Sequence, residues 1–154
     1  MKRLAALVLI LGVGMGMFTQ PLPSIASDLP CTSETAARKA AQTSPSSLSF
    51  LGLGLSLSCH NKLPEAIAVF RQIIQKDPAF AAGFNVYSDL GHALQRAGNS
   101  EAAIATYQKA IQYHADPQSG AYEALSKLLR QQGRIQEADA VLKKKPQFDS
   151  EGGG

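Results

Sequence analysis

The sequence predicts an all-α fold built from three stacked helix pairs. Two observations support this prediction: one pattern of apolar and small residues occurs three times in the same register, and a turn residue divides each copy into two halves. Alanine is also abundant, which favours helix. With 154 residues, 45% of them hydrophobic and 18% charged, the chain has the length and balance of one globular domain.

The three copies begin at Phe50, Tyr87 and Tyr122, so their starts are 37 and 35 residues apart. In each copy a leucine, a small residue and a second leucine follow the aromatic residue at fixed distances. A turn residue, an alanine and a large apolar residue complete the pattern. The positions that recur are Leu53, Leu90 and Leu125; Gly54, Gly91 and Ser126; Leu57, Leu94 and Leu129; Asn61, Gly98 and Gly133; Ala66, Ala103 and Ala138; and Phe70, Tyr107 and Leu142.

This pattern resembles the tetratricopeptide repeat, a helix-turn-helix unit of about 34 residues. The resemblance implies a right-handed α-solenoid of about three repeats over residues 47–145. The implied repeats are 47–83, 84–118 and 119–145. The second copy, with YSDLGHAL and EAAIATYQKAI, is the nearest match, whereas the third departs from the pattern at Asp139 and Lys145.

The stretch SLSFLGLGLSLSC in the first copy alternates leucine with glycine and serine, which by itself indicates a half-buried strand. The register of the repeat overrides this signal and predicts a helix that is apolar on more than one side. Leu48, Leu51 and Leu55 then lie on the face that lines the groove in this family, and another element is expected to cover them. In the second copy, we expect Gly91 to contact the facing helix near Ala103.

Residues 27–46 are expected to form a capping helix and a turn in front of the first repeat. The segment TSETAARKAAQT is rich in helix formers, Ser33 is its expected N-cap, and Pro45 lies in the turn. Cys31 and Cys59 each lie 14 residues from Pro45, so an antiparallel helix hairpin would bring them together. A disulfide would then join the cap to the first repeat; the alternative is two buried free thiols.

Residues 1–26 have the organisation of a secretory signal peptide. Lys2 and Arg3 precede the apolar run Leu4–Phe18, and small residues lead to a cleavage site after Ala26. The run has 15 residues, fewer than the roughly 20 that a membrane-spanning helix needs. We therefore expect export to the periplasm, a thylakoid lumen or the outside of the cell. The alternative is an uncleaved signal, the one expected route to a membrane.

The sequence contains no recognisable motif for catalysis, cofactor binding or metal binding. Its three histidines do not have zinc-site spacing, and neither HExxH nor GxSxG occurs. The formal charge is only +3, and no basic run is interleaved with aromatic residues that would stack on bases. We expect no catalytic residues, no cofactor, no metal site and no nucleic-acid partner. The end of the chain, residues 146–154, is expected to be a flexible tail.

The resemblance places a peptide-binding groove on the first helix of each pair. Carried over by register, its residues are Asn85, Ser88, His92, Gln95 and Arg96 in the second repeat and Glu123, Lys127, Arg130 and Gln131 in the third. Four of these side chains can be cationic and only one is acidic, so an acidic peptide or a carboxylate of a partner protein would suit them. The alternative is that they are solvated polar positions.

The sequence therefore predicts a non-enzymatic, exported adaptor or assembly factor that binds a partner protein or peptide in its concave groove. Two other functions stay open. One is a thiol-based or redox protein that uses Cys31 and Cys59, and the other is a structural module that associates with itself. The sequence does not predict the oligomeric state.

Overall fold

Helices make up most of the residues that the computed structural model describes, which are 31–113 and 120–146. They are α1 (Glu34–Thr43), α2 (Ser47–Cys59), α3 (Leu63–Lys76), α4 (Pro78–Gly83), α5 (Val86–Arg96), α6 (Ser100–Tyr113), α7 (Ala121–Gln131) and α8 (Ile135–Lys143). No strand occurs in these two ranges, which confirms the all-α class. The predicted signal peptide and residues 147–154 of the predicted tail lie outside them.

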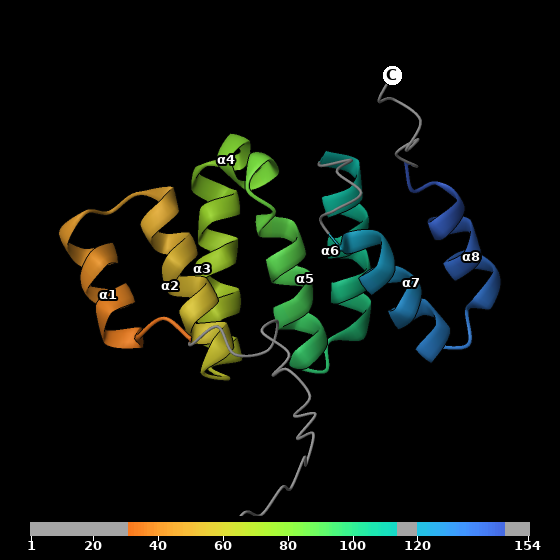
Figure 1. Ribbon diagram of the computed structural model, residues 1–154, viewed down its shortest axis with the longest axis horizontal. Helices are drawn as coiled ribbons and strands as arrows, with labels where there is room; N and C mark the ends of the chain where they lie inside the picture. Colours follow the sequence, from red (N-terminus) through yellow and green to blue (C-terminus); the bar gives the residue numbers. More distant parts are fainter. Residues whose placement is uncertain (1–30, 114–119, 147–154) are drawn as a thin grey trace, which may run out of the picture. The chain divides into compact units, whose positions relative to one another are not determined.

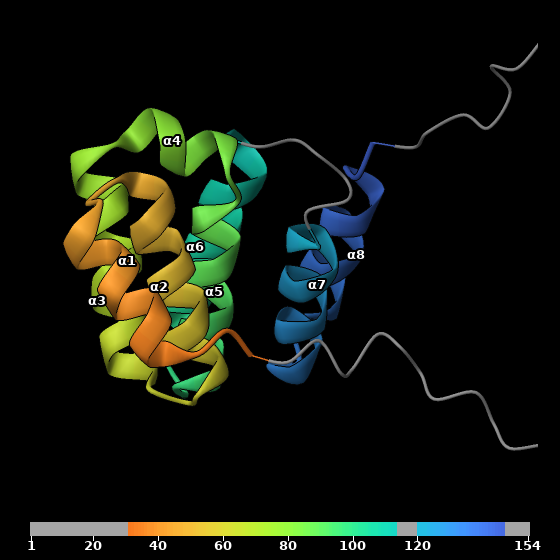
Figure 2. The same cartoon turned by 60° about the vertical axis from the view of Figure 1, so that its left-hand side comes forward.

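The longer helices pair and stack as the repeat pattern predicts. Helix α2 packs on α3, α5 on α6, and α7 on α8. The second helix of one pair also packs on the first helix of the next, α3 on α5 and α6 on α7. Figures 1 and 2 show the helices following one another from α1 to α8 in this order. The described part of the chain is therefore an α-solenoid of three helix pairs with an additional helix, α1, in front.

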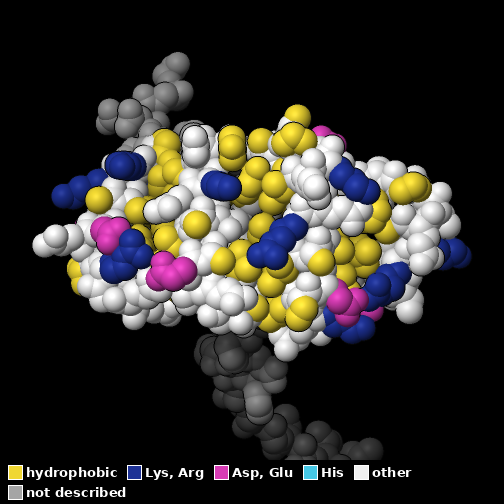
Figure 3. All heavy atoms as spheres, turned by 180° about the vertical axis from the view of Figure 1, so that it is seen from behind, with side chains coloured by type: hydrophobic (Ala, Val, Ile, Leu, Met, Phe, Trp, Pro, Cys, Tyr) yellow, Lys and Arg dark blue, Asp and Glu magenta, His cyan; other side chains and the backbone are white. Residues whose placement is uncertain are grey.

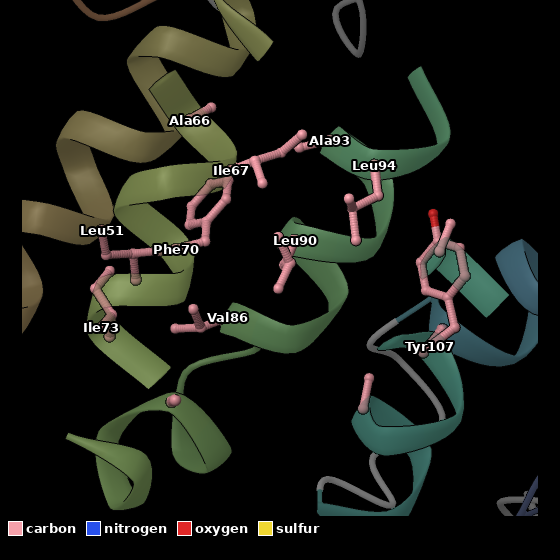
Figure 4. Close-up of a cluster of buried hydrophobic side chains, with 14 of the residues drawn as sticks. Leu51, Ala66, Ile67, Phe70, Ile73, Val86, Leu90, Ala93, Leu94 and Tyr107 are labelled. Atoms are coloured by element: carbon pink, nitrogen blue, oxygen red, sulfur yellow. The ribbon is translucent and has the colours of Figure 1, made fainter. Parts of the chain in front are cut away.

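The small residues of the pattern lie directly against aromatic rings of the facing helix. A Cβ atom added to Gly54 would lie 2.5 Å from the ring of Phe70, and one added to Gly91 would lie 2.6 Å from the ring of Tyr107. Figure 4 shows Phe70 and Tyr107 among the buried side chains of α3, α5 and α6. Gly91 therefore lies against the ring of Tyr107, one turn after Ala103 on the facing helix, and a helical side chain points back over the preceding turn.

The turns between paired helices are the same in all three repeats. Asn61, Gly98 and Gly133 occupy one register position and have φ angles of 60°, 79° and 77°. After each of them, a backbone N–H donates to the carbonyl five residues earlier: Lys62 to Leu57, Asn99 to Leu94 and Arg134 to Leu129, each at 2.9 Å. This is the hydrogen bond of a Schellman motif, and it explains why glycine or asparagine recurs there.

The short helix α4 was not expected from the sequence, which predicts Pro78 only as a residue beyond the end of α3. In the structure Pro78 begins α4, and Oδ1 of Asp77 accepts a hydrogen bond from the N–H of Phe80 at 3.1 Å. Proline suits the first position of a helix and aspartate suits the N-cap. The Asp-Pro pair therefore ends one helix and starts the next.

The N-terminal helix α1 packs on α2 and is joined to it covalently. Its buried residues are Ala37 and Ala41. Cys31 and Cys59 form a disulfide with their Cα atoms 5.9 Å apart, as the hairpin geometry predicts, and are not two free thiols. Ser33 is the N-cap residue by position, but its side chain makes no capping hydrogen bond.

The apolar face of α2 is covered only in part. Leu51 is buried in the cluster that includes Phe70 and Ile73 (Figure 4), so it is covered and not open to a ligand. Leu48 and Leu55 remain 63% and 45% exposed. No helix in the described ranges is long and apolar enough to cross a membrane.

Candidate functional site

Two depressions in the surface meet along α7. The first, of about 430 Å³, lies between α5 and α7 and is lined by His92, Gln95, Arg96, Gly120, Glu123, Ala124 and Lys127. The second, of about 480 Å³, lies between α7 and α8 and is lined by Glu123, Ser126, Lys127, Arg130, Gln131 and Leu142. We call them the α5–α7 pocket and the α7–α8 pocket. Glu123 and Lys127 line both, so the two pockets form one continuous surface.

Seven of the nine groove residues named from the sequence line these pockets. The four lining residues that were not named are Gly120, Ala124, Ser126 and Leu142. Ser126 and Leu142 do belong to the recurring pattern, but that pattern indicates packing between helices. The pattern alone therefore could not show that α8 leaves part of Leu142 accessible in the third repeat.

Asn85 and Ser88 line neither pocket. Asn85 is the N-cap residue of α5, with φ of 58°, and Ser88 is only 4% exposed in the first turn of that helix. The side-chain oxygens Oδ1 of Asn85 and Oγ of Ser88 are buried without a hydrogen-bond partner in the described part of the chain. Helix α4, which the sequence does not predict, packs against α5.

A hydrogen-bonded group of three side chains lies beside the α5–α7 pocket. The hydroxyl of Tyr107 donates to Oε1 of Gln95 at 2.9 Å and lies 2.9 Å from Nδ1 of His92. Since a hydroxyl has a single hydrogen, Nδ1 of His92 must carry the proton of the second bond. Desolvation lowers the pKa of His92, although part of the side chain is exposed, and this favours the neutral ring. Neutral His92 then has an acceptor at Nε2 and does not contribute the positive charge that the sequence suggests.

Arg96 is held by the end of the first helix pair. Its guanidinium donates to the carbonyl oxygen of Ser58 at 2.7 Å, to Oγ of Ser58 at 3.2 Å and to Oδ1 of Asn61 at 3.2 Å. These contacts add a donor to a carbonyl at the C-terminus of α2 that also accepts from the N–H of Asn61, and a cation is favourable there. The sequence could not show them, because Arg96 and Ser58 are 38 residues apart.

The charges of the third repeat are mostly paired with α8 and with the residues that follow it. Arg130 pairs with Asp139, and Glu123 pairs with Lys145. The hydrogen bond from Lys145 lowers the pKa of Glu123, so this carboxylate stays charged. Lys127 is exposed and makes no hydrogen bond or ion pair with another described residue. Of the four residues expected to be cationic, Lys127 is therefore the one whose charged group has no bonded partner among the described residues, whereas Arg96 keeps its charge but is held by neutral groups.

Other surfaces offer less chemistry. Where α6, α7 and α8 meet, a depression of about 230 Å³ is lined by Gln108, Ile111, Tyr122, Leu125, Val141 and Lys144. Figure 3 shows the face that is turned away in Figure 1, where hydrophobic side chains lie among scattered lysines and arginines with few acidic groups. In the part of the chain that the structure describes, no three His, Cys, Asp or Glu side chains gather as a metal site would require.

One half-buried acid was not expected from the sequence. Desolvation raises the pKa of Asp89 on α5 to about 6. Nothing in the sequence indicates this shift, because a single aspartate on a repeat helix is usually solvated. Asp89 does not line the two pockets, so we treat it as part of the interior of α5 and not of the site.

Comparisons with known proteins agree with the fold. Residues 88–147 match the model of the tetratricopeptide repeat family. Solved structures of similar fold include MamA AMB-1, which is 22% identical with a TM-score of 0.61 over 78% of this chain and 64% of its own. Two mutant forms of MamA are 23% and 24% identical, with TM-scores of 0.59, over 73% of this chain and 63% and 60% of theirs. This chain thus spans less than two thirds of each structure, and no curated protein matches it.

Proposed function

Because residues 88–147 match the tetratricopeptide repeat family, we propose that the chain binds a segment of a partner protein along α7. The observation that carries this proposal is the pair of adjoining pockets on α5, α7 and α8. Repeat arrays of this kind use extended surfaces for binding, and the walls of both pockets are mainly apolar. The protein is then an interaction module without catalytic residues or a cofactor.

In this proposal the partner segment is acidic and the protein is an exported adaptor or assembly factor. Lys127 supports an acidic partner, because its charge lies where the two pockets meet and has no described partner. The disulfide between Cys31 and Cys59 supports export, because disulfides persist in oxidising compartments such as the periplasm, a thylakoid lumen or the outside of the cell. The same disulfide argues against a thiol-based activity, since it joins α1 to α2.

The test is affinity capture from the cells that make the protein, followed by mass spectrometry. Gln131→Trp should fill the α7–α8 pocket, because Gln131 is exposed and lines that pocket. Gln112→Trp is the matched control: this residue is exposed on α6 and lines neither pocket. We expect Gln131→Trp to lose a partner that the wild type and Gln112→Trp retain. Equal recovery of every partner by all three proteins would show that the binding surface lies elsewhere.

A further inference from the structure

We infer that the segment bound along α7 has two apolar side chains, three positions apart, with one acidic residue between them. This inference rests on the proposed function and specifies its ligand. Three observations carry it: two apolar pockets on either side of one helix, a lysine where they meet that has no hydrogen-bond or ion-pair partner in the described part of the chain, and the use of the neighbouring cations in contacts within the protein.

The two pockets call for two apolar side chains. Each is an open depression large enough for a leucine or phenylalanine side chain. Ala124 contributes to the wall of the α5–α7 pocket, and the half-buried Leu142 contributes to that of the α7–α8 pocket. Burying one apolar side chain in each would remove apolar surface on both partners from water, which is the main favourable contribution to binding.

The arrangement of the pockets determines the spacing of the two side chains. They lie on opposite sides of α7, and neighbouring helices are typically 8–10 Å apart. A segment in the polyproline II conformation rises about 3.1 Å per residue and has three residues per turn. Residues i and i+3 of such a segment lie on one face, roughly 9 Å apart. They can therefore enter the two pockets while the residues between them cross α7.

The residues that cross α7 meet Lys127. Two other described cationic side chains line the pockets: Arg96 is hydrogen-bonded to the end of α2, and Arg130 pairs with Asp139. The one described acidic lining residue, Glu123, pairs with Lys145. Lys127 is the cationic group that remains without a bonded partner, so one acidic residue at i+1 or i+2 gains an ion pair. A second acidic residue would find no other cationic group among the described lining residues that is not already bonded within the protein. The bound segment is therefore expected to be acidic at one position and not along its whole length.

A random peptide library displayed on phage and selected on the purified protein tests the pattern. We expect enrichment of peptides with apolar residues at i and i+3 and one Asp or Glu between them. Enriched peptides without this arrangement would overturn the inference but leave the proposed function standing. If no peptide were enriched over a surface without protein, both the inference and the proposed function would be wrong.

An enriched peptide is then made with its acidic residue and with the corresponding amide. We expect Lys127→Gln to weaken binding of the acidic peptide about three- to tenfold, the range for a partly desolvated ion pair. The amide peptide should bind the wild type more weakly than the acidic peptide does, by the same factor. Its affinity for Lys127→Gln should equal its affinity for the wild type. Lys109→Gln, which removes an exposed lysine of α6 outside both pockets, should bind as the wild type does. Equal affinity of Lys127→Gln and wild type for the acidic peptide would overturn the inference.

Discussion

The second and third helix pairs, α5–α6 and α7–α8, have the same sequence register, but corresponding residues are buried to different extents. Tyr107 of α6 is 0% exposed, whereas its counterpart Leu142 of α8 is only half-buried. Ile104 of α6 is buried, whereas its counterpart Asp139 is exposed and pairs with Arg130. The two pairs therefore differ most at the positions of their second helices.

The neighbours of the two helices explain this difference. Helix α6 packs between α5 and α7, whereas the main packing partner of α8 among the described helices is α7. The register position of Ile104 and Asp139 is apolar and buried in α6 but charged and exposed in α8. Arrays of repeats need such a polar outer face at a terminal unit. Asp139 and Lys145, which depart from the repeat pattern, make two such positions polar, and their ion pairs run back to α7.

The largest difference between the two pairs should appear at the close helix contact. We expect Gly91→Ala to lower the free energy of unfolding by about 2–3 kcal/mol, since the new Cβ would lie 2.6 Å from the ring of Tyr107. The ring cannot shift freely, because its hydroxyl is bonded to His92 and Gln95. Urea denaturation measures the change. Ser126→Ala, at the same register position of α7, adds no atom and should change stability by less than about 1 kcal/mol.

Asp89 of α5 corresponds to Ala124 of α7, so the half-buried acid of the second pair has no counterpart at this position of the third. Its pKa of about 6 in the folded protein is above the ordinary 3.8, which means that the folded state favours the neutral carboxyl. This group therefore adds least to stability above about pH 6 and most below about pH 4. Asp89→Asn stays neutral, and we expect it to raise the free energy of unfolding near pH 7 by about 1–3 kcal/mol.

The pH dependence separates this cause from others. Urea denaturation of Asp89→Asn and wild type should give a gap that closes as the pH falls from about 7 to about 4. The pKa values of Glu123 and Glu137 are lowered by Lys145 and Arg134, so their contribution to stability is lost in acid and is common to both proteins. A gap of constant size over this range would show that the carboxyl of Asp89 is not the origin of the effect.

Tyr107 also has a polar function that Leu142 cannot have. Tyr107→Phe keeps the ring against Gly91 but removes the hydrogen bonds with His92 and Gln95. We expect a loss of about 1 kcal/mol, because both partners lie at the pocket and can turn to water. Urea denaturation again provides the measurement. A loss as large as that of Gly91→Ala would mean that the hydroxyl, and not the ring, determines the packing of the second pair.

The fold could be predicted because the packing positions recur three times. Leu90 and Leu94, for example, can be identified as packing positions only by comparison with Leu53 and Leu57 in the first copy. All four lie in the buried cluster. The Cys31–Cys59 disulfide followed from the length of a hairpin. In contrast, α4 depends on the single Asp-Pro pair and has no counterpart in the other repeats.

The site was predicted less completely, because register gives the face of a residue but not its partners. His92, Arg96 and Lys127 do line the pockets, as the register indicates. Their available charge differs, since Arg96 is bonded to a carbonyl of α2 and His92 to Tyr107. Such contacts between distant residues depend on the packed structure. The sequence alone therefore overestimates the positive charge available to a ligand, because Arg96 and His92 already make hydrogen bonds within the protein.

The smallest expected change in stability tests whether Asp139 makes α8 a terminal helix. Asp139→Ile places there the residue that α6 has at Ile104, and it removes an exposed ion pair with Arg130 that contributes at most about 1 kcal/mol. Stability should hardly change, but this position of α8 becomes apolar, as it is in α6, on which the next helix packs. We therefore expect the variant to self-associate, measured as mass in solution over a dilution series.

The control for this experiment is Asp139→Asn, which removes the same charge without adding apolar surface. It should keep the mass of the wild type at every concentration, because an exposed amide gives no drive for association. If Asp139→Ile also keeps that mass, the outer face of α8 does not resemble the face that α6 presents to α7. The contrast between the second and third pairs would then reflect local packing within α7 and α8, and the departures from the repeat pattern would not mark a terminal unit.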